Sequence, residues 1–299
     1  MMQAATICTR LRTHRLSYSF SPGICSQTTR VMIRAKQRYV TTTTTTTALV
    51  SCIVGDIATT TADAITVSSN PNLVGNLQTN YWRFSGRTNT NGSVRMKGGT
   101  HLDSYCKQII LNRKRGEEGS CRLLQVGEAV TTLAGPNIPS AKHVIHVVVP
   151  DSIITHYNDN IAAAAGNDHD TENDDANILH LRLALLRKSY TSVLECAVNL
   201  NEANKTGISV AIPALGCGIN GWNHRVSAKV AGEALAEFVK IKNDIESRQL
   251  LHNSDSGNDN LLKHVNFVLK SKSVGDIWEE ELSDFNFDLN FKLNTTKSQ

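Results

Sequence analysis

Residues 207–240 combine a short apolar run, a glycine-rich loop and an alanine-rich segment, and they constrain the fold more than any other stretch. Residues 208–212 are mostly apolar and β-branched, which predicts a buried strand. The three glycines within residues 216–221 allow the backbone to turn tightly and to approach a bound group closely. From Arg225 onward, apolar residues recur at approximately helical spacing. The sequence therefore predicts a strand, a loop and a helix in succession.

Two roles are open to the glycine loop. Between the carboxyl end of a strand and a helix, backbone N–H groups can bind a phosphate, and the helix N-terminus adds partial positive charge. The spacing is GxGxxG, but no early βαβ unit surrounds it, and no Gly-Lys-Ser/Thr follows. Neither the dinucleotide fingerprint nor the nucleoside-triphosphate loop is therefore predicted. The same residues could also form a tight turn that only packs the helix on the sheet.

The net charge of +4 is unevenly distributed along the 299 residues. No Asp or Glu precedes Asp56, whereas seven of the 31 Lys and Arg residues occur by Arg38. The remaining 24 basic residues face 27 acidic ones. The basic balance therefore describes the N-terminal arm, and it does not predict a nucleic-acid-binding surface.

Residues 1–47 are rich in Arg, Ser and Thr, and they contain no continuous apolar core for a secretory signal or a membrane span. We interpret them as a transit peptide, with mitochondrial import as the prediction. Plastid import, or a plain disordered arm on a cytoplasmic protein, is the alternative. The seven-threonine run from Thr41 is a low-complexity segment, which we interpret as a flexible joint.

The seven cysteines form no CxxC pair and no regular framework, which is typical of reduced thiols in an intracellular compartment. No metal-ligand spacing occurs among the cysteines and the ten histidines. We therefore expect no metal site.

The loop resembles the macro domain family, in which a segment "FPAxSTGxYGxP…A" closes over the diphosphate of ADP-ribose. Here it reads IPALGCGINGWNHRVSA. The proline, the three glycines and the alanine-bearing helix match. Asn220 replaces the family's aromatic residue and Asn223 its proline. The resemblance implies that residues 216–221 wrap a diphosphate through backbone N–H groups.

A second block resembles the family's "GDI…DAIVNAAN" and accompanies two predicted strands, residues 49–53 and 64–68. By this resemblance, Asp56 and Ile57 would face the adenine and Asn70 would hold the distal ribose. Val67 departs from the family's first Asn. On the residues alone, Asp56 and Asn70 are typical of a cap and a turn.

In a third block, residues 91–94 match the family's "DGAI" and lead into a helix through Cys106. The resemblance implies that they contact the distal ribose and its flanking phosphate. Many hydrolytic members use an Asp where Asn91 stands. Because a carboxamide does not ionise at neutral pH, Asn91 retains hydrogen bonding but not carboxylate-assisted hydrolysis.

The fourth block, GEAVTTLAGPNIPSAKHVIHVVVP, resembles "GEAVxTxGxxLPAKxVIHxVGP" and predicts strands at residues 128–131 and 141–149. His146 lies inside an apolar run, which favours a core histidine over a catalyst.

The alternation of strands and helices predicts a three-layer α/β/α domain with a mixed central sheet over residues 48–285. We expect helices at 179–200, 225–243 and 276–282, a last strand at 265–269 and a frayed tail at 286–299. Polar insertions are predicted near residues 72–90, 158–177 and 252–260, and the second is interpreted as a disordered loop. The aromatic residues within 81–84 (Tyr81, Trp82 and Phe84) could pack in the core or stack on a base.

By the resemblance, the chain binds ADP-ribose or mono-ADP-ribosylated proteins, with no further cofactor and no membrane partner. The alternatives are a hydrolase acting on ADP-ribosyl esters or O-acetyl-ADP-ribose, and an interaction scaffold without the ligand. Trp222 or residues 81–84 could replace the missing aromatic wall. No catalytic residue is assigned beyond Asn91 at the family's acid position. The expected ligand-binding residues are Asp56, Ile57, Asn70, Asn91, Gly92, Ser93, Val94, Gly216, Cys217, Gly218, Ile219, Asn220 and Gly221.

Overall fold

The computed structural model describes residues 49–73, 90–115, 123–152, 171–201, 207–250, 262–285 and 287–293. The strands are β1 (Leu49–Val54), β2 (Ala64–Ser68), β3 (Ala129–Leu133), β4 (His143–Val147), β5 (Ile208–Pro213), β6 (Leu262–Leu269) and β7 (Asp288–Leu293). The helices are η1 (Ile57–Thr59), α2 (Thr90–Arg115), α4 (Thr171–Asn201), α5 (His224–Leu250) and α6 (Lys272–Ser283).

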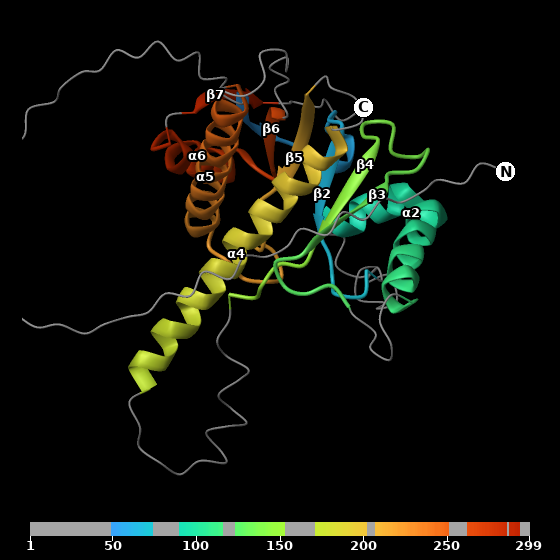
Figure 1. Cartoon of the computed structure of the whole chain (residues 1–299), viewed down its shortest axis with the longest axis horizontal. Helices are drawn as coiled ribbons and strands as arrows, with labels where there is room; N and C mark the ends of the chain where they lie inside the picture. Colours follow the sequence, from blue (N-terminus) through green and yellow to red (C-terminus); the bar gives the residue numbers. More distant parts are fainter. Residues whose placement is uncertain are drawn as a thin grey trace, which may run out of the picture. The chain divides into compact units, whose positions relative to one another are not determined.

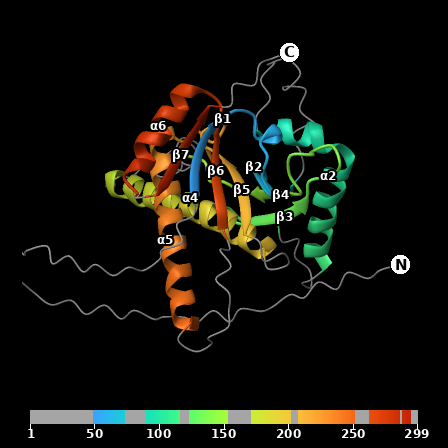
Figure 2. The same ribbon diagram turned by 90° about the horizontal axis from the view of Figure 1, so that it is seen from above.

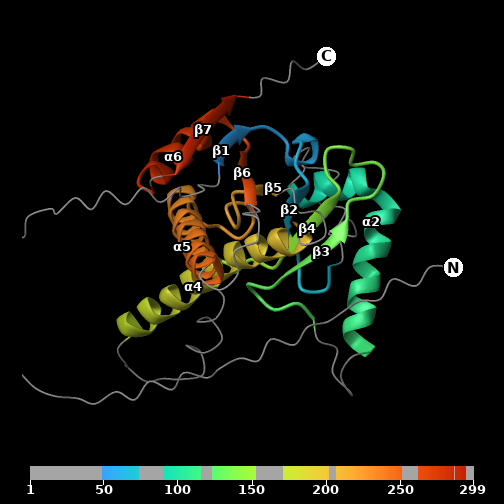
Figure 3. The ribbon, with the colours of Figure 1, turned by 45° about the horizontal axis from the view of Figure 1, so that its top comes forward.

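These strands form one sheet in the order β3-β4-β2-β5-β6-β1-β7 (Figure 1; Figure 3 also labels β1). Every neighbouring pair in it is parallel except β3 and β4, which are antiparallel. β1 lies between the last two strands of the sequence, since Leu49 pairs with both His264 of β6 and Asp288 of β7. The mixed sheet that the sequence predicted is confirmed.

Helices cover both faces of the sheet, with α4, α5 and α6 on one side and α2 on the other (Figures 2 and 3). The two hydrophobic cores follow the alternation of side chains along each strand. On β5, Val210 and Ile212 pack with α4 and α5, whereas Ala211 packs in the core that α2 covers. The three-layer α/β/α architecture is therefore confirmed.

A break divides α2 into two helical pieces, which diverge in Figure 3. Gly99 causes it, with φ 56° and ψ −148°, a conformation that residues with a Cβ rarely adopt. The short first piece carries residues 91–94; its Ser93 hydroxyl donates to Asp56 at the start of η1, and its Val94 lies in the same hydrophobic core as Val67 of β2. The glycine thus orients the segment that was predicted to contact the distal ribose.

The predicted disordered loop at 158–177 is wrong in its last part, because α4 already begins at Thr171. Glu172, Asp174 and Asp175 fall in the first turns. Acidic residues are favoured in the first turn of a helix, so the acidic composition read as a solvated loop is also typical of a helix start. Residues 158–170 lie outside the described part.

The tail predicted to be frayed, residues 286–299, contains β7, so residues 265–269 are not the last strand. The sequence DLNFKL alternates apolar and polar residues at the period of a strand, a signal that the Asn- and Lys-rich context obscured. Pairing with β1 supplies the backbone partners that hold the strand.

Several predictions fall on residues outside the described ones, and they stay predictions. They concern the transit peptide, the aromatic residues 81–84 and the insertion near 252–260. No helix within the described ranges is long and apolar enough to cross a membrane.

Candidate functional site

Parallel strands bring three of the expected binding segments to one edge of the sheet. Asp56 follows β1, Asn70 follows β2 and the glycine loop follows β5, each at the carboxyl end of its strand. Ligands of open α/β sheets bind outside this edge. The three segments therefore lie where such a ligand would be held.

Two glycines of the loop have backbone conformations that favour glycine, with φ +76° at Gly216 and +73° at Gly221. The Trp222 N–H donates to the Gly216 carbonyl (3.0 Å), and the Gly221 N–H donates to the Gly218 carbonyl (3.1 Å). A Cβ at position 216 would overlap the Trp222 ring, whereas a Cβ at position 218 would meet nothing within 4 Å. Gly216 is therefore needed for folding, and Gly218 faces open space.

A buried polar network fixes the start of the loop from below. The Leu215 N–H donates to the Tyr190 hydroxyl (3.0 Å), and the Ser227 hydroxyl donates to the Leu215 carbonyl (2.9 Å). The Tyr190 and Ser227 hydroxyls lie 2.7 Å apart, and both residues are buried. Burial raises the pKa of Tyr190, so its hydroxyl stays neutral. Leu215 is thus held on both its donor and its acceptor.

Asn220 fixes the other end of the loop to residues 149–152. Its side-chain N–H group donates to the Val149 carbonyl (3.0 Å) and to the Asp151 carboxylate (2.7 Å). Its own carbonyl accepts from the Ser152 N–H (2.8 Å). The side chain predicted to line the ligand site is therefore a tether for the loop.

Trp222 does not replace the missing aromatic wall, so the first of the two alternatives is wrong. The second, residues 81–84, lies outside the described residues. The side chain is buried, and its indole N–H donates to the Pro150 carbonyl (2.7 Å). Its ring packs beneath Gly216. The tryptophan therefore supports the loop from inside the domain.

The middle of the loop presents backbone donors. Among the described residues, no hydrogen bond joins the N–H groups of Gly218, Ile219 or Asn220 to a protein acceptor, whereas the Cys217 N–H donates to the Ala214 carbonyl (3.3 Å). Ile219, at the tip, is 82% exposed. Successive free N–H groups in a tight turn form a concave anion site.

Cys217 is not an activated nucleophile. Burial raises the pKa of its thiol to about 11. The thiol is therefore protonated at neutral pH, and the reactive thiolate is absent. The four cysteines of the described ranges, Cys52, Cys106, Cys196 and Cys217, are free thiols.

Asp56 caps η1 and contacts the expected phosphate segment. One carboxylate oxygen accepts from the Ala58 N–H (3.0 Å), and the other accepts from the Ser93 hydroxyl (2.9 Å). The Ile57 and Val94 side chains are buried in the core that α2 covers. A ligand would therefore meet the backbone of these two residues.

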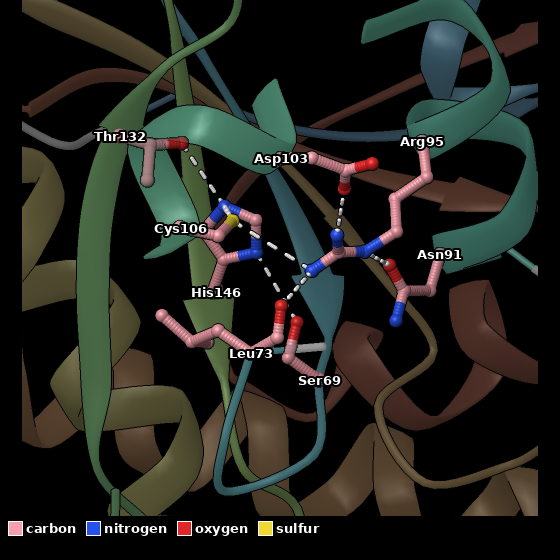
Figure 4. A network of polar contacts seen from close by, with 8 residues as sticks. All are labelled: Ser69, Leu73, Asn91, Arg95, Asp103, Cys106, Thr132 and His146. Atoms are coloured by element: carbon pink, nitrogen blue, oxygen red, sulfur yellow. Dashed lines mark hydrogen bonds and ion pairs between the residues drawn. The ribbon is translucent and has the colours of Figure 1, made fainter. Parts of the chain in front are cut away.

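Arg95 was not predicted, and it connects two of the predicted segments (Figure 4). It is 3% exposed and donates to the Asn91 side-chain oxygen, the Leu73 carbonyl and the Asp103 carboxylate. The Leu73 N–H in turn donates to the Asn70 carbonyl (3.0 Å). The signal in the sequence was the spacing of four residues between Asn91 and Arg95, which places both on one helix face.

His146 is a core histidine, as the sequence predicted, and it is fully buried. Its Nδ1 lies 3.2 Å from the Ser69 hydroxyl and its Nε2 lies 3.0 Å from the Thr132 hydroxyl. Burial and the nearby Arg95 charge lower its pKa to about 3. The Cys106 sulfur lies 3.7 Å from Nε2, and burial raises the pKa of that thiol. Both groups are neutral, so they form no thiolate–imidazolium pair.

Across the ranges that the structure describes, no group of three or more His, Cys, Asp or Glu residues could hold a metal ion. Asn91 stands at the family's acid position and carries a carboxamide in place of a carboxylate. Its side-chain oxygen accepts a hydrogen bond from Arg95. The arrangement as described is suited to binding an anionic ligand.

No protein-family model matches the chain. Among curated proteins, it is similar to an O-acetyl-ADP-ribose deacetylase of Enterobacter sp. (strain 638), with 27% identity over 193 residues that cover 64% of this chain and 80% of that protein. The protein of the same name from Citrobacter rodentium (strain ICC168) is 29% identical over 187 residues, covering 62% of this chain and 78% of the relative.

Among solved structures, the chain is similar to an Oceanobacillus iheyensis macrodomain. A variant of that protein with ADP-ribose aligns with a TM-score of 0.51 at 21% identity, over 78% of this chain and 91% of that one. The complex with ADP aligns with a TM-score of 0.50 at 21% identity, over 78% and 89%. The fold is therefore that of a macrodomain. The four sequence blocks resemble the macro domain family, and the curated relatives and the fold agree with that resemblance.

Proposed function

We propose that this protein binds ADP-ribose, free or attached to a protein, and that residues 216–221 hold the diphosphate. The observation that carries the proposal is the turn at residues 218–220, whose N–H groups have no protein acceptor among the described residues. The network of Tyr190, Ser227 and Asn220 holds this turn before any ligand arrives. Preorganised donors of this kind favour binding because little order remains to be imposed.

The remaining contacts follow from the family resemblance. Asp56 and Ile57 would face the adenine, while Asn70 and residues 91–94 would hold the distal ribose and its phosphate. Two contacts support this grouping. The Ser93 hydroxyl donates to Asp56, and Arg95 connects Asn91 to the turn that begins at Asn70.

Calorimetric titration of ADP-ribose into the full chain tests the proposal. We expect micromolar binding by the wild type and a loss of at least about a hundredfold in Gly218→Glu, because a carboxylate would enter the anion site. Gly218→Ala is the matched control, since its Cβ meets open space. It should bind within a few-fold of the wild type.

Equal loss in Gly218→Ala and Gly218→Glu would indicate a damaged fold instead of a blocked anion site. Absence of heat with the wild type would overturn the proposal and favour an interaction scaffold that has lost the ligand.

The curated relatives named O-acetyl-ADP-ribose deacetylase favour ester hydrolysis as a second candidate function. In that reaction, water oxygen bonds to the acyl carbon, the bond from that carbon to the ribose oxygen breaks, and acetate and ADP-ribose leave. Asn91 supplies no base, so the proton of the water would pass to a phosphate of the substrate and from there to the departing ribose oxygen. Acetate release that vanishes in Asn91→Ala would support this function, and no release by the wild type would exclude it.

We further propose that residues 1–47 direct the protein to mitochondria. Their Arg-rich and acid-free composition supports this. A fluorescent protein fused to residues 1–47 should enter mitochondria. Location in plastids or throughout the cytoplasm would contradict the proposal.

A further inference from the structure

Arg95 has a partner for each nitrogen of its guanidinium group (Figure 4). Nη1 donates to the Asp103 carboxylate (2.5 Å), Nη2 to the Leu73 carbonyl (2.5 Å) and Nε to the Asn91 side-chain oxygen (3.2 Å). Three planar donors fixed on three different segments leave the fork one orientation. Arg95 therefore holds the Asn91 side chain in one orientation.

The contact also decides which end of the Asn91 carboxamide faces the arginine. A guanidinium group has donors and no acceptor, so only the amide oxygen can meet Nε. The amide N–H group then points away from Arg95 (Figure 4). Position 91 is thereby held as a hydrogen-bond donor.

The turn at residues 70–73, which contains a strained residue, also depends on Arg95. Leu73 has φ +53°, the one positive φ among the non-glycine residues that the structure describes, and its side chain is buried. Such a conformation persists where the surroundings hold it. Its carbonyl is the acceptor for Nη2, so Arg95 stabilises the turn of residues 70–73 while it orients Asn91.

We propose that Arg95 is a positioning residue that holds Asn91, through its oxygen, with its N–H group toward the distal end of bound ADP-ribose, and that locks the Asn70-bearing turn beside it. This inference rests on the proposed function for its ligand. The contact between Arg95 and position 91 also affects the chemistry available at the family's acid position. A carboxylate placed there would form an ion pair with Arg95, and a paired carboxylate is a weaker base.

A titration without ligand tests the contact itself. In Asn91→Asp, the carboxyl introduced at position 91 can be followed by its carbon NMR signal as the pH is lowered. We expect its pKa to be at least about one unit lower with Arg95 present than in Asn91→Asp combined with Arg95→Gln. Equal values in the two backgrounds would overturn the proposal.

Titrations of ADP-ribose and ADP test the effect on ligand, because ADP lacks the distal ribose. Arg95→Gln and Asn91→Ala should each weaken ADP-ribose about tenfold and change ADP by less than about twofold. The double variant should lose about tenfold rather than a hundredfold, since both changes remove one arrangement. Additive losses, or equal losses for the two ligands, would contradict positioning.

Two further variants separate positioning from folding. Asp103→Asn removes the ion pair but leaves the Nε contact, so it should keep ADP-ribose affinity within about threefold. Arg95→Lys keeps the charge but has no Nε donor, so it should lose affinity as Arg95→Gln does. Rescue by Arg95→Lys would show that charge alone suffices and would overturn the proposal.

The outcomes also separate this inference from the proposed function. Wild-type binding of ADP-ribose with an additive cycle would retain the function and reject the role of Arg95. If the wild type binds neither ligand, the function and the ligand-facing role of Arg95 both fail. The NMR titration would still decide whether Arg95 holds position 91.

Discussion

His146 shows at the level of one residue how burial determines chemistry in this protein. The imidazole is fully buried and bonded on both nitrogens to neutral partners. Removing a charged imidazolium from water is costly, and Arg95 adds repulsion, so the pKa falls to about 3. The unfolded chain, whose histidine has an ordinary pKa near 6.5, binds the proton first as pH falls.

Stability should therefore decrease as pH falls below about 6.5 and continue to decrease toward about 3. Between pH 7 and pH 5, this histidine alone should lower the free energy of unfolding by about 2 kcal/mol. Urea unfolding at both pH values measures the change. His143 and His224 also have lowered pKa values and contribute in the same direction.

His146→Gln isolates the contribution of the one residue. It keeps hydrogen-bonding groups for Ser69 and Thr132 but cannot titrate. The variant should show about 2 kcal/mol less pH dependence than the wild type over the same interval. An unchanged pH dependence would contradict the assignment.

Substitution by alanine should destabilise the protein strongly at Gly216 and very little at Gly218 of the same loop. Gly216→Ala meets both a positive φ and the Trp222 ring, and it should lower the free energy of unfolding by about 2 kcal/mol or more. Gly218→Ala meets neither and should stay within about 0.5 kcal/mol of the wild type. Parallel urea titrations compare them, and equal losses would contradict the described loop.

The roles of residues that belong to a sequence motif were predicted better than the roles of residues that depend on tertiary contacts. The glycine spacing placed the turn, but only the fold shows that Gly216 is required by a tryptophan and Gly218 is not. Arg95 was missed because a charged helical residue is usually solvated. Its burial depends on Leu73 and Asp103, whose positions no local pattern specifies.

At the level of elements, the loop after β5 depends on α4 through a single hydroxyl group. Tyr190→Phe would leave the buried Leu215 N–H without its acceptor and should lower the free energy of unfolding by about 1–3 kcal/mol. Hydrogen exchange of the Leu215 amide should accelerate as well. Tyr105→Phe is a matched control on α2, because its hydroxyl has no hydrogen bond in the described residues. Equal effects in both variants would contradict the role of the network.

The observed bounds and buried faces of helices and strands differ from those predicted where local composition and tertiary contacts disagree. Of the apolar residues at helical spacing after Arg225, Val230, Leu235 and Phe238 are buried, whereas Val226 is 37% exposed. The small Ala228, Ala231 and Ala234 are buried beside them. Alanine permits close approach to the sheet, and a hydropathy stripe underweights it. The start of α4 and the strand β7 were missed for another reason: polar neighbours obscured a correct local pattern.

At the level of the whole molecule, the sheet is completed by its C-terminal strand. Removal of residues 288–299 would expose the hydrogen-bonding edge of β1. Open edges pair with other chains. The truncated protein should unfold at lower urea concentration and form oligomers on gel filtration. A control that lacks only residues 294–299 should behave as the wild type, and a monomeric, equally stable truncation would contradict the contribution of β7.

The architecture itself was predictable because it depends on alternation repeated over many elements and on four ordered motif blocks. The order of strands in the sheet was not predictable from the residues, since periodicity specifies faces but not neighbours. The positions of the functional segments followed from the topology, because parallel strands bring their carboxyl ends to one edge.

The position of β1 has a consequence for synthesis on the ribosome. It is the first described strand to emerge, yet its neighbours β6 and β7 are the last. A nascent chain therefore carries β1 with both edges unpaired until β6 and β7 have emerged, and such long-range pairing is slow. The sheet cannot be completed before β7 has left the ribosome, so β1 stays open to pairing with other chains until then.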